Sequence, residues 1–411
     1  MAGHLNRFLF LVALCIGCWQ ATVVAQANTA SIFGDDDRTP LEGSGISLAR
    51  GIGFIHDRDA KYTCTAFCVS DSLVATNAHC VLRRDMTRAK VKLSRVRFNM
   101  LDTSLARQSS TGTPERRTIT TTTALETSLS GQPALALFHG DFVPNRNSSR
   151  VYDDWAIAKL RSPFCKGRAL DLLAIDPTEL QAQATKDSVF MIGYHGGRFE
   201  QGHLRSSDCG INDINHRKFL SSQRRAFANS PDLLLHHCDM EKGASGSPIF
   251  LQTPRGPSVV AVNSGYVERR QYRTTQRSGG RTRQKLLWQY TANTAVLTRA
   301  FVSGLQRFER ESLLETEDQF RRVQQLLKDK GYYAGPIDAI YGPGTRRAIF
   351  RHEEERGWAK LGTPTLELLT DLENEVGEGV DEMVTEPIYE PAVGRTNKSK
   401  PSSAKRSATS G

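Results

Sequence analysis

The sequence predicts an antiparallel all-β domain followed by a small all-α domain, and three observations support this. Between about residues 51 and 267, apolar and β-branched runs of strand length alternate with turns rich in Gly, Asn, Asp and Ser. Beyond residue 315, apolar residues recur at helical spacing instead. The chain has 411 residues, which is long for a single hydrophobic core, so we expect two or three structural units.

The first 27 residues have the features of a secretory signal peptide. Arg7 precedes an apolar stretch at residues 8–18, and residues 25–27 (Ala-Gln-Ala) form the small-x-small pattern of a cleavage site. This stretch is short for a bilayer span, and no later stretch reaches the required length. We therefore expect an exported protein, periplasmic or extracellular, with no transmembrane segment after signal cleavage, in which residues 28–47 form an N-terminal linker.

Six cysteines remain after that cleavage, and export permits them to form disulfides. They are Cys64, Cys68, Cys80, Cys165, Cys209 and Cys238. No two form a Cys-x-x-Cys pair or lie beside a second histidine at zinc-finger spacing, so the sequence predicts bridges, no metal site and no cofactor. Cys18 in the leader is an alternative lipid-attachment site, but Cys15 stands where that signal prefers leucine.

The strands predicted in the β domain are short. They cover residues 69–75, 96–101, 155–160, 189–194, 233–236, 248–251 and 259–262. Many short strands separated by turns favour an antiparallel barrel or sandwich over a parallel sheet. Between residues 286 and 308 the pattern changes, because Leu297, Phe301, Leu305 and Phe308 are spaced to line one face of a helix. We expect this terminal helix to close the β domain.

Three short segments, in one order along the chain, carry residues suited to nucleophilic catalysis. They are Thr76-Asn77-Ala78-His79-Cys80, Asp154-Trp155-Ala156 and Gly243-Ala244-Ser245-Gly246-Ser247-Pro248. A serine hydroxyl is a poor nucleophile at neutral pH, so acyl transfer needs a base to take its proton and an acid to orient that base. We therefore predict a catalytic triad of Ser245 as nucleophile, His79 as general base and Asp154 as acid.

These segments resemble the motifs of the trypsin-like serine peptidases, in particular the bacterial branch that contains glutamyl-endopeptidase-like enzymes. The chain order His79, Asp154, Ser245 matches this class and differs from the subtilisin and α/β-hydrolase orders. The resemblance implies a double β-barrel over residues 48–311, with six strands in each barrel and the site in the crevice between them. The backbone N–H groups of Gly243 and Ser245 are suited to form the oxyanion hole.

The same resemblance bears on the disulfides. The pairs expected, the last of them by elimination, are Cys64 with Cys80, Cys209 with Cys238, and Cys68 with Cys165. The first pair holds the loop of the catalytic histidine.

The substrate pocket is expected around Asp239, Asn263, Ser264 and Gly265. Asp239 lies six positions before Ser245, where trypsin-like specificity uses an acid to receive Arg or Lys. The other interpretation is a general bacterial Cys-Asp pattern, in which the acid does not face the substrate. A preference for Glu is less favoured, because glutamyl-specific relatives carry a histidine where this chain has Asn263.

Activation is expected to differ from that of the animal enzymes. In those, a newly cut N-terminal amine pairs with an acid directly before the nucleophile, whereas this chain has Ala244 there. That zymogen switch cannot operate here, and other trimming of residues 28–48 stays open.

Residues 315–373 predict a second unit of three helices. The first helix covers residues 316–330, with a capping box at its start and Gly331 as a left-handed C-cap. The second covers residues 345–356, and the third begins at Thr363 with a proline in its first turn. Three short helices of this kind bury one small core.

The helical unit resembles the peptidoglycan-binding domain 1 family over its whole length, most clearly in the loop of residues 331–345. Two departures are Asp338-Ala339 in place of the usual Asp-Gly and His352-Glu353 in place of the usual Phe-Gln. The resemblance implies peptidoglycan as a binding partner. The alternative is a helical module that only docks on the protease.

The remaining segments are polar. Residues 268–285 contain six arginines and are expected to form a long loop, residues 118–123 a polar insertion, and residues 374–411 a disordered tail. The formal charge of +10 and the pI near 9.3 favour attraction to anionic surfaces such as cell-wall polymers. No recognised helix or aromatic platform accompanies these arginines, so a nucleic-acid partner is not expected.

The predicted function is that of an exported serine endopeptidase that hydrolyses protein or peptide substrates through an acyl-enzyme and is held near the cell wall by its C-terminal module. Two alternatives stay open. One is a catalytically silent wall-binding protein that uses the barrel as a recognition surface. The other is a hydrolase of an ester or of a wall-peptide crosslink.

Overall fold

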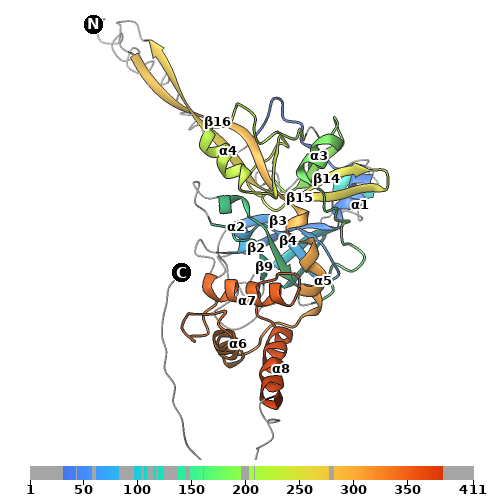
Figure 1. Ribbon diagram of the computed structural model, residues 1–411. Helices are drawn as coiled ribbons and strands as arrows, with labels where there is room; N and C mark the ends of the chain where they lie inside the picture. Colours follow the sequence, from blue (N-terminus) through green and yellow to red (C-terminus); the bar gives the residue numbers. More distant parts are fainter. Residues whose placement is uncertain are drawn as a thin grey trace, which may run out of the picture.

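The computed structural model describes the chain between residues 31 and 382, with gaps. The described ranges are 31–42, 44–57, 62–82, 97–102, 106–108, 114–116, 119–124, 137–143, 149–160, 162–195, 203–207, 209–276 and 282–382. Two β-sheet units lie one above the other, and a helical module lies below them at the end nearest α5, as Figure 1 shows. The predicted all-β domain followed by an all-α domain is confirmed.

The first sheet has seven antiparallel strands in the described residues. In order across the sheet they are β8 (Ile119–Ala124), β5 (Arg97–Asp102), β2 (Ile52–Asp57), β3 (Tyr62–Cys68), β4 (Leu73–Thr76), β10 (Ala156–Lys159) and β9 (Leu137–His139). A separate pair is formed by β6 (Ala106–Gln108) and β7 (Pro114–Arg116). The pairing of β4 with β10 places Thr76 opposite Ala156, so the residues that follow β4 lie beside those that precede β10.

The second sheet also has seven strands in the part of the chain that is described. In order they are β1 (Thr39–Pro40), β12 (Leu204–Ser206), β11 (Val189–Gly193), β14 (Pro248–Thr253), β15 (Gly256–Gln276), β16 (Thr282–Leu297) and β13 (Leu233–His236). Every neighbouring pair is antiparallel. Each sheet thus has one strand more than the six that the resemblance implies, and the second sheet's extra strand is the short β1 from the N-terminal segment.

Short helices connect the strands of both sheets. The α-helices are α1 (Ser44–Ala49), α2 (Ala78–Val81), α3 (Pro177–Gln183), α4 (Ser221–Ala228) and α5 (Val302–Arg310), and the 3-10 helices include η4 (Ser149–Tyr152) and η6 (Thr298–Ala300). Within the described residues, no helix is both long and apolar enough to cross a bilayer.

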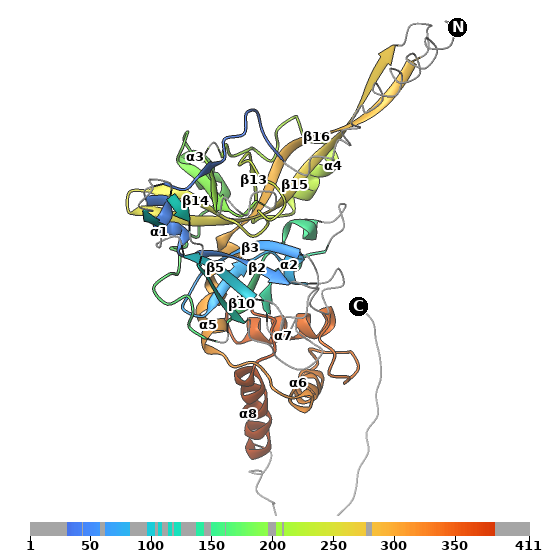
Figure 2. The ribbon, with the colours of Figure 1, turned by 180° about the vertical axis from the view of Figure 1, so that it is seen from behind.

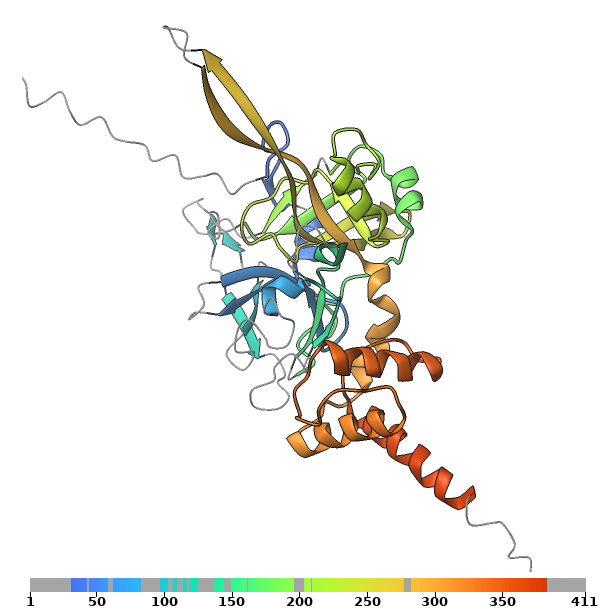
Figure 3. The ribbon, with the colours of Figure 1, turned by 60° about the vertical axis from the view of Figure 1, so that its left-hand side comes forward.

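A two-stranded ribbon formed by β15 and β16 projects from the second sheet, and its far end stands clear of the body in Figures 1 and 3. The prediction of a loop at residues 268–285 is wrong over most of that range, because β15 and β16 stay paired as far as Gln276 and Thr282. The helix expected between residues 286 and 308 is also wrong in its first half. Residues up to Leu297 belong to β16, and α5 begins only at Val302.

Three further expectations need correction. Residues 118–123 fall largely in β8, which pairs with β5 along its whole length. Within the expected linker at residues 28–47, the described segment that begins at Ser31 packs on the second sheet through β1. The third module helix begins at Leu366 rather than Thr363, and it continues to Glu382, into the start of the expected tail.

The helical module contains α6 (Glu317–Asp329), α7 (Pro343–Glu355) and α8 (Leu366–Glu382). The capping box at Thr316 is present, since its side chain accepts a hydrogen bond from the N–H of Gln319 and the Gln319 side chain accepts one from the N–H of Thr316. Gly331 ends α6 with φ +76°, in the left-handed region that favours glycine. Phe320 and Leu368 are among the fully buried side chains of the module core.

The module covers the free edge of the first sheet. β9 is the edge strand there, and two of its carbonyl groups accept hydrogen bonds from module side chains. Thr363 Oγ1 donates to the carbonyl of Leu137 (3.0 Å), and Arg346 Nη2 donates to that of His139. Apolar side chains of the first sheet, α5 and the module form one continuous buried cluster. The structure therefore joins the module to the β domain as a packed neighbour.

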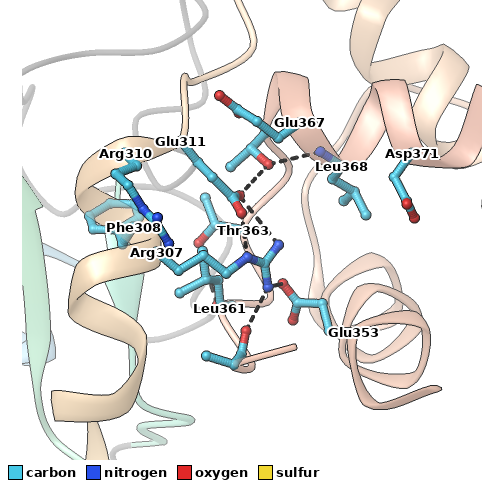
Figure 4. A network of polar contacts seen from close by, with 12 residues as sticks. Arg307, Phe308, Arg310, Glu311, Glu353, Leu361, Thr363, Glu367, Leu368 and Asp371 are labelled. Atoms are coloured by element: carbon cyan, nitrogen blue, oxygen red, sulfur yellow. Dashed lines mark hydrogen bonds and ion pairs between the residues drawn. The ribbon is translucent and has the colours of Figure 1, made fainter. Parts of the chain in front are cut away.

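A polar network around Arg307 of α5 fixes the same junction from the other side (Figure 4). The Arg307 guanidinium pairs with Glu311 and, at 2.7 Å, with the fully buried Glu353 of α7. It also donates to the carbonyl of Ala359 (2.6 Å), while Thr365 donates to Glu311 (2.7 Å). Burial raises the pKa of Glu353 to about 7, although its contacts with Arg307 act in the opposite direction.

Candidate active site

His79 lies on α2, the four-residue helix that follows β4. The disulfide between Cys64 and Cys80 ties this helix to β3. Asn77, the residue before the helix, donates from Nδ2 to the carbonyl of Asp154 (2.7 Å). The helix that carries the histidine is thus attached to the segment that carries the acid.

Asp154 lies between η4 and β10 and holds His79 at two points. Its Oδ2 is 2.6 Å from His79 Nδ1, and its Oδ1 accepts a hydrogen bond from the main-chain N–H of His79 (2.9 Å). The acid side chain is 6% exposed and the histidine 28% exposed. Since a carboxylate oxygen accepts hydrogen bonds, His79 Nδ1 is the donor in this contact.

Ser245 lies in the turn between β13 and β14. The flanking Gly243 and Gly246 have φ values of +97° and +86°, which favour glycine. A Cβ on Gly246 would lie 2.0 Å from the carbonyl oxygen of Thr65, so the turn packs directly on β3. Ser245 Oγ donates to the carbonyl of Ser264 (3.2 Å).

The carbonyl of Gly243 has two donors, the main-chain N–H of Thr65 (2.9 Å) and its Oγ1 hydroxyl (2.8 Å). These bonds fix the turn that carries the N–H groups of Gly243 and Ser245, whose role as oxyanion donors stays a prediction. Thr76 in turn donates to the carbonyl of Thr65 (2.9 Å). Sequence reasoning did not identify Thr65, and its position directly after Cys64 was the available signal.

Asp239 holds the N-terminal segment. Its carboxylate accepts hydrogen bonds from the main-chain N–H groups of Phe33 (2.8 Å) and Asp37 (3.1 Å), and the residue is 2% exposed. Burial raises the pKa of Asp239 to about 6, while the hydrogen bonds from Phe33 and Asp37 oppose this change. This geometry favours the interpretation in which the acid does not face the substrate.

Asn263 supports the turn that contains Ser245. Its Nδ2 donates to the carbonyl of Ala244 (2.7 Å), and its Oδ1 lies 3.1 Å from His236 Nε2. Burial lowers the pKa of His236 to about 3, so this imidazole is neutral and donates to Asn263. The amide is fully buried and both ends are engaged.

The other two residues expected in the pocket lie next to Asn263 on β15. The Ser264 hydroxyl is bonded to Thr294 on β16, 3.1 Å from its carbonyl and 3.0 Å from its hydroxyl, while the Ser264 carbonyl faces Ser245 Oγ. Gly265 pairs with Thr294. Of the four residues predicted for the pocket, Asp239 and Asn263 are thus engaged in supporting contacts, and Ser264 and Gly265 lie on the strand segment beside Ser245.

The six cysteines form the three expected pairs, Cys64 with Cys80, Cys68 with Cys165, and Cys209 with Cys238. Among the described residues, two groups have potential metal-ligating atoms close together. The first, around His79, contains Cys64 and Cys80, whose sulfurs are already in a disulfide.

The second group comprises His352, Asp371 and Glu375 in the module. Asp371 is paired with His352 (2.9 Å) and with Arg356 (2.5 Å), and Glu375 is paired with Arg356 (3.2 Å) and Lys330. The Arg356 and Lys330 side chains thus already pair with both carboxylates, so this group is part of an ion-pair network.

Two family models match the sequence. The model described as "Trypsin-like peptidase domain" matches residues 64–262, and the one described as "Putative peptidoglycan binding domain" matches residues 316–369. The first match includes His79, Asp154 and Ser245. No curated protein sequence matches the chain.

Similar solved structures include a Glu endopeptidase in complex with MPD, at 15% identity and a TM-score of 0.40, covering 68% of this chain and 99% of that one. Two scabies mite inactivated protease paralogues also match. S-I1 has 14% identity and a TM-score of 0.38 (64% and 95% coverage), and S-D1 has 11% identity and a TM-score of 0.38 (66% and 97% coverage). The assignment rests on the two family models and on the arrangement of the sheets and helices. The chain carries a trypsin-like serine peptidase domain followed by a domain of the peptidoglycan-binding domain 1 family.

Proposed function

We propose that the protein is an exported serine endopeptidase that hydrolyses peptide bonds through an acyl-enzyme on Ser245 and is held near the cell wall by its helical module. The contact that carries the catalytic proposal is the 2.6 Å hydrogen bond between Asp154 Oδ2 and His79 Nδ1. Together with the main-chain bond from His79 to the same carboxylate, it fixes both the orientation and the tautomer of the base.

In the proposed reaction, Ser245 Oγ gives its proton to His79 Nε2 and attacks the scissile carbonyl carbon. Asp154 stays ionised and stabilises the imidazolium that forms. The oxyanion is stabilised by the N–H groups of Gly243 and Ser245, each worth about 3 to 4 kcal/mol in related hydrolases. His79 then protonates the leaving amine. In the second half of the reaction, His79 takes a proton from a water molecule, which attacks the acyl carbon, and His79 returns that proton to Ser245 Oγ as the acid product leaves.

The first experiment is covalent labelling of the purified mature protein with a fluorophosphonate probe. We expect labelling of the wild type and none of a Ser245→Ala variant, because the probe reacts only with an activated serine. A folded wild type that takes no label would support the alternative of a silent wall-binding protein.

For the module, we propose that peptidoglycan binds in the groove between α5 and α8. This groove has a volume of about 760 Å³ and is lined by Trp358, Arg310, Asp371 and Asn374, among others. The half-buried indole ring of Trp358 is stacked with Arg307 and lies beside charged and amide side chains, so the groove combines an aromatic edge with hydrogen-bonding groups, which suits a sugar. Because α5 belongs to the peptidase domain, both domains contribute to the groove.

Sedimentation with purified sacculi tests this. An intact Ser245→Ala chain is expected to sediment, and an added Arg310→Ala and Asn374→Ala pair is expected to reduce the bound fraction. Both side chains are exposed, so the pair is not expected to unfold the module. Lys328→Ala, exposed on α6 away from the groove lining, is the matched control. An intact chain that stays in the supernatant would contradict the wall-binding proposal.

A further inference from the structure

The N-terminal segment 31–40 contacts three consecutive residues that lead into the nucleophile turn. Ser31 exchanges two main-chain hydrogen bonds with Met240 (2.8 and 3.1 Å). Asp239, one residue earlier, accepts from the N–H groups of Phe33 and Asp37. In Figure 2 the dark-blue N-terminal segment is seen to loop over the second sheet.

The third contact is made by Arg38, whose side chain is 1% exposed. Its Nη1 lies 3.1 Å from Glu241 Oε2 and 3.1 Å from His195 Nδ1, at the end of β11. Its Nε and Nη2 both donate to the Asp36 carboxylate (2.7 Å each). Burial disfavours the charged guanidinium, but the hydrogen bonds to Asp36 and the negative charges of Asp36 and Glu241 outweigh burial and raise the pKa of Arg38 above its ordinary value.

The segment is itself anchored away from the turn. Thr39 and Pro40 form β1, which pairs with β12, and Asp37 accepts a hydrogen bond from the N–H of Ser207 (2.8 Å) directly after β12. The contacts with residues 239–241 therefore tie the start of the nucleophile turn to the second sheet.

Glu241 links the N-terminal segment to the turn that contains Ser245, because it contacts Arg38 through its side chain and Ala244 through its carbonyl. Its carbonyl accepts the N–H of Ala244 (3.1 Å), which closes the turn that contains Gly243 and precedes Ser245. The other side of the turn is held by the two bonds from Thr65 to the carbonyl of Gly243. The turn is thus held between β3 on one side and the N-terminal segment on the other.

We propose that residues 31–40 are a built-in activation strap, in which Arg38 is a positioning residue that holds Glu241 and so keeps the oxyanion turn in its competent form. Ala244 offers no charge to a newly cut N-terminus, and Arg38 supplies a buried cation to the same turn from within the chain. The proposal rests on the proposed peptidase function. It means that the chain needs no cut between residues 31 and 44 to become active, and that such a cut inactivates it.

The test compares Arg38→Met, Glu241→Gln and the double variant with Arg50→Met, a matched control at an exposed arginine after α1. We expect Arg38→Met to lower kcat by roughly 10- to 100-fold, less than the roughly 10² to 10³ lost when an oxyanion donor is removed outright. KM should change little. The double variant should be no worse than the single ones, and Arg38→Lys should recover part of the loss.

Two further readouts separate positioning from general stability. A peptide aldehyde, which forms an oxyanion on Ser245, should lose affinity for Arg38→Met by about the factor lost in kcat/KM, while a product peptide should not. In a Ser245→Ala background, hydrogen exchange of the amides in residues 240–246 should be faster with Arg38→Met than with Arg50→Met.

Unchanged kcat in Arg38→Met would overturn the strap while leaving the peptidase proposal intact. If the wild type itself takes no fluorophosphonate label, the peptidase proposal fails and the exchange measurement alone decides on the strap. Faster exchange of residues 240–246 then supports the anchoring of the turn, and unchanged exchange overturns it.

Discussion

Arg346 Nη1, on the second helix of the module, lies 3.2 Å from the carbonyl oxygen of Gly140, directly after the edge strand β9. The N–H of Gly140 donates to the carbonyl of Trp155 (3.0 Å), the residue after Asp154, the proposed catalytic acid. A Cβ on Gly140 would lie 2.3 Å from the carbonyl oxygen of Asp153, so the two segments are in close contact. A module arginine is therefore two hydrogen bonds away from the segment that carries the acid.

Replacing Arg346 by Met should destabilise the whole protein. The buried carbonyl of His139 would lose its donor, at a cost of about 1 to 3 kcal/mol, whereas the carbonyl of Gly140 keeps the His139 ring nitrogen Nδ1 as a partner (2.7 Å). We expect the free energy of unfolding to fall by about 1 to 3 kcal/mol, and kcat to fall several-fold as the acid segment loosens. Denaturant unfolding and steady-state kinetics measure both. Arg347→Met, exposed on the same helix, should leave both unchanged, and equal behaviour of the two variants would refute the coupling.

Asp154→Asn should remove catalysis while keeping the fold. An asparagine can still accept the main-chain N–H of His79 through its oxygen, but its amide favours the wrong tautomer of the imidazole. We expect kcat to fall by roughly 10⁴-fold, as in other Ser-His-Asp hydrolases, with the unfolding midpoint changed little. Asp171→Asn, exposed in the same domain, is the control. A loss smaller than tenfold would argue against a triad role for Asp154.

Asp239→Asn should weaken the enzyme without changing which residue it cleaves after. The carboxylate is occupied by the N–H groups of Phe33 and Asp37, and an amide cannot accept both bonds equally well. A panel of peptides varied at P1 should show kcat/KM lowered by a similar factor for every member. A selective loss for Arg and Lys peptides would instead place this acid in the specificity pocket.

Stability at acid pH should depend on His203. Burial lowers the pKa of this residue to about 4, although its hydrogen bond with the carbonyl of Ile52 acts in the opposite direction. The unfolded chain therefore binds a proton here between about pH 6.5 and pH 4 that the folded chain does not, so stability present above pH 6.5 is lost as the pH falls. Asp239 and Glu353 act in the opposite sense over part of this window, because burial raises their pKa values.

A difference measurement isolates the contribution of His203. His203→Gln keeps a donor for the carbonyl of Ile52 and removes the titrating group. The unfolding free energy of the wild type should fall relative to this variant by about 1.4 kcal/mol per pH unit between pH 6 and pH 4.5. Parallel curves in urea titrations at these pH values would contradict the prediction.

Structural features that depend on a few neighbouring residues could be predicted from the sequence. The capping box at Thr316 and the left-handed Gly331 are read directly from residue types a few positions apart. The glycines on both sides of Ser245 are likewise part of one short motif, and both have the left-handed backbone that this motif requires. The triad itself stays a prediction, which rests on the order of three motifs along the chain.

What the sequence did not predict depends on distant contacts. Residues 286–297 contain apolar residues that fit a helix or a strand, and pairing with both β13 and β15 decides for the strand. Arg38 and Arg346 each have the pattern of a solvated surface arginine, yet each has a buried partner more than 150 positions away, His195 for Arg38 and Gly140 for Arg346. The sequence left two interpretations of Asp239, a specificity acid that faces the substrate or an acid that does not. The hydrogen bonds from the N-terminal segment, which only the structure reveals, favour the second.

The free edge of β9 can be covered only after the helical module has been synthesised. β9 is synthesised about 200 positions before Arg346 and Thr363, the residues that occupy its free carbonyls. Until they are made, the first sheet has an open edge, which is a template for pairing with another strand. We therefore expect a fragment that stops before the module to aggregate through this edge, because the module supplies the side chains that cover it.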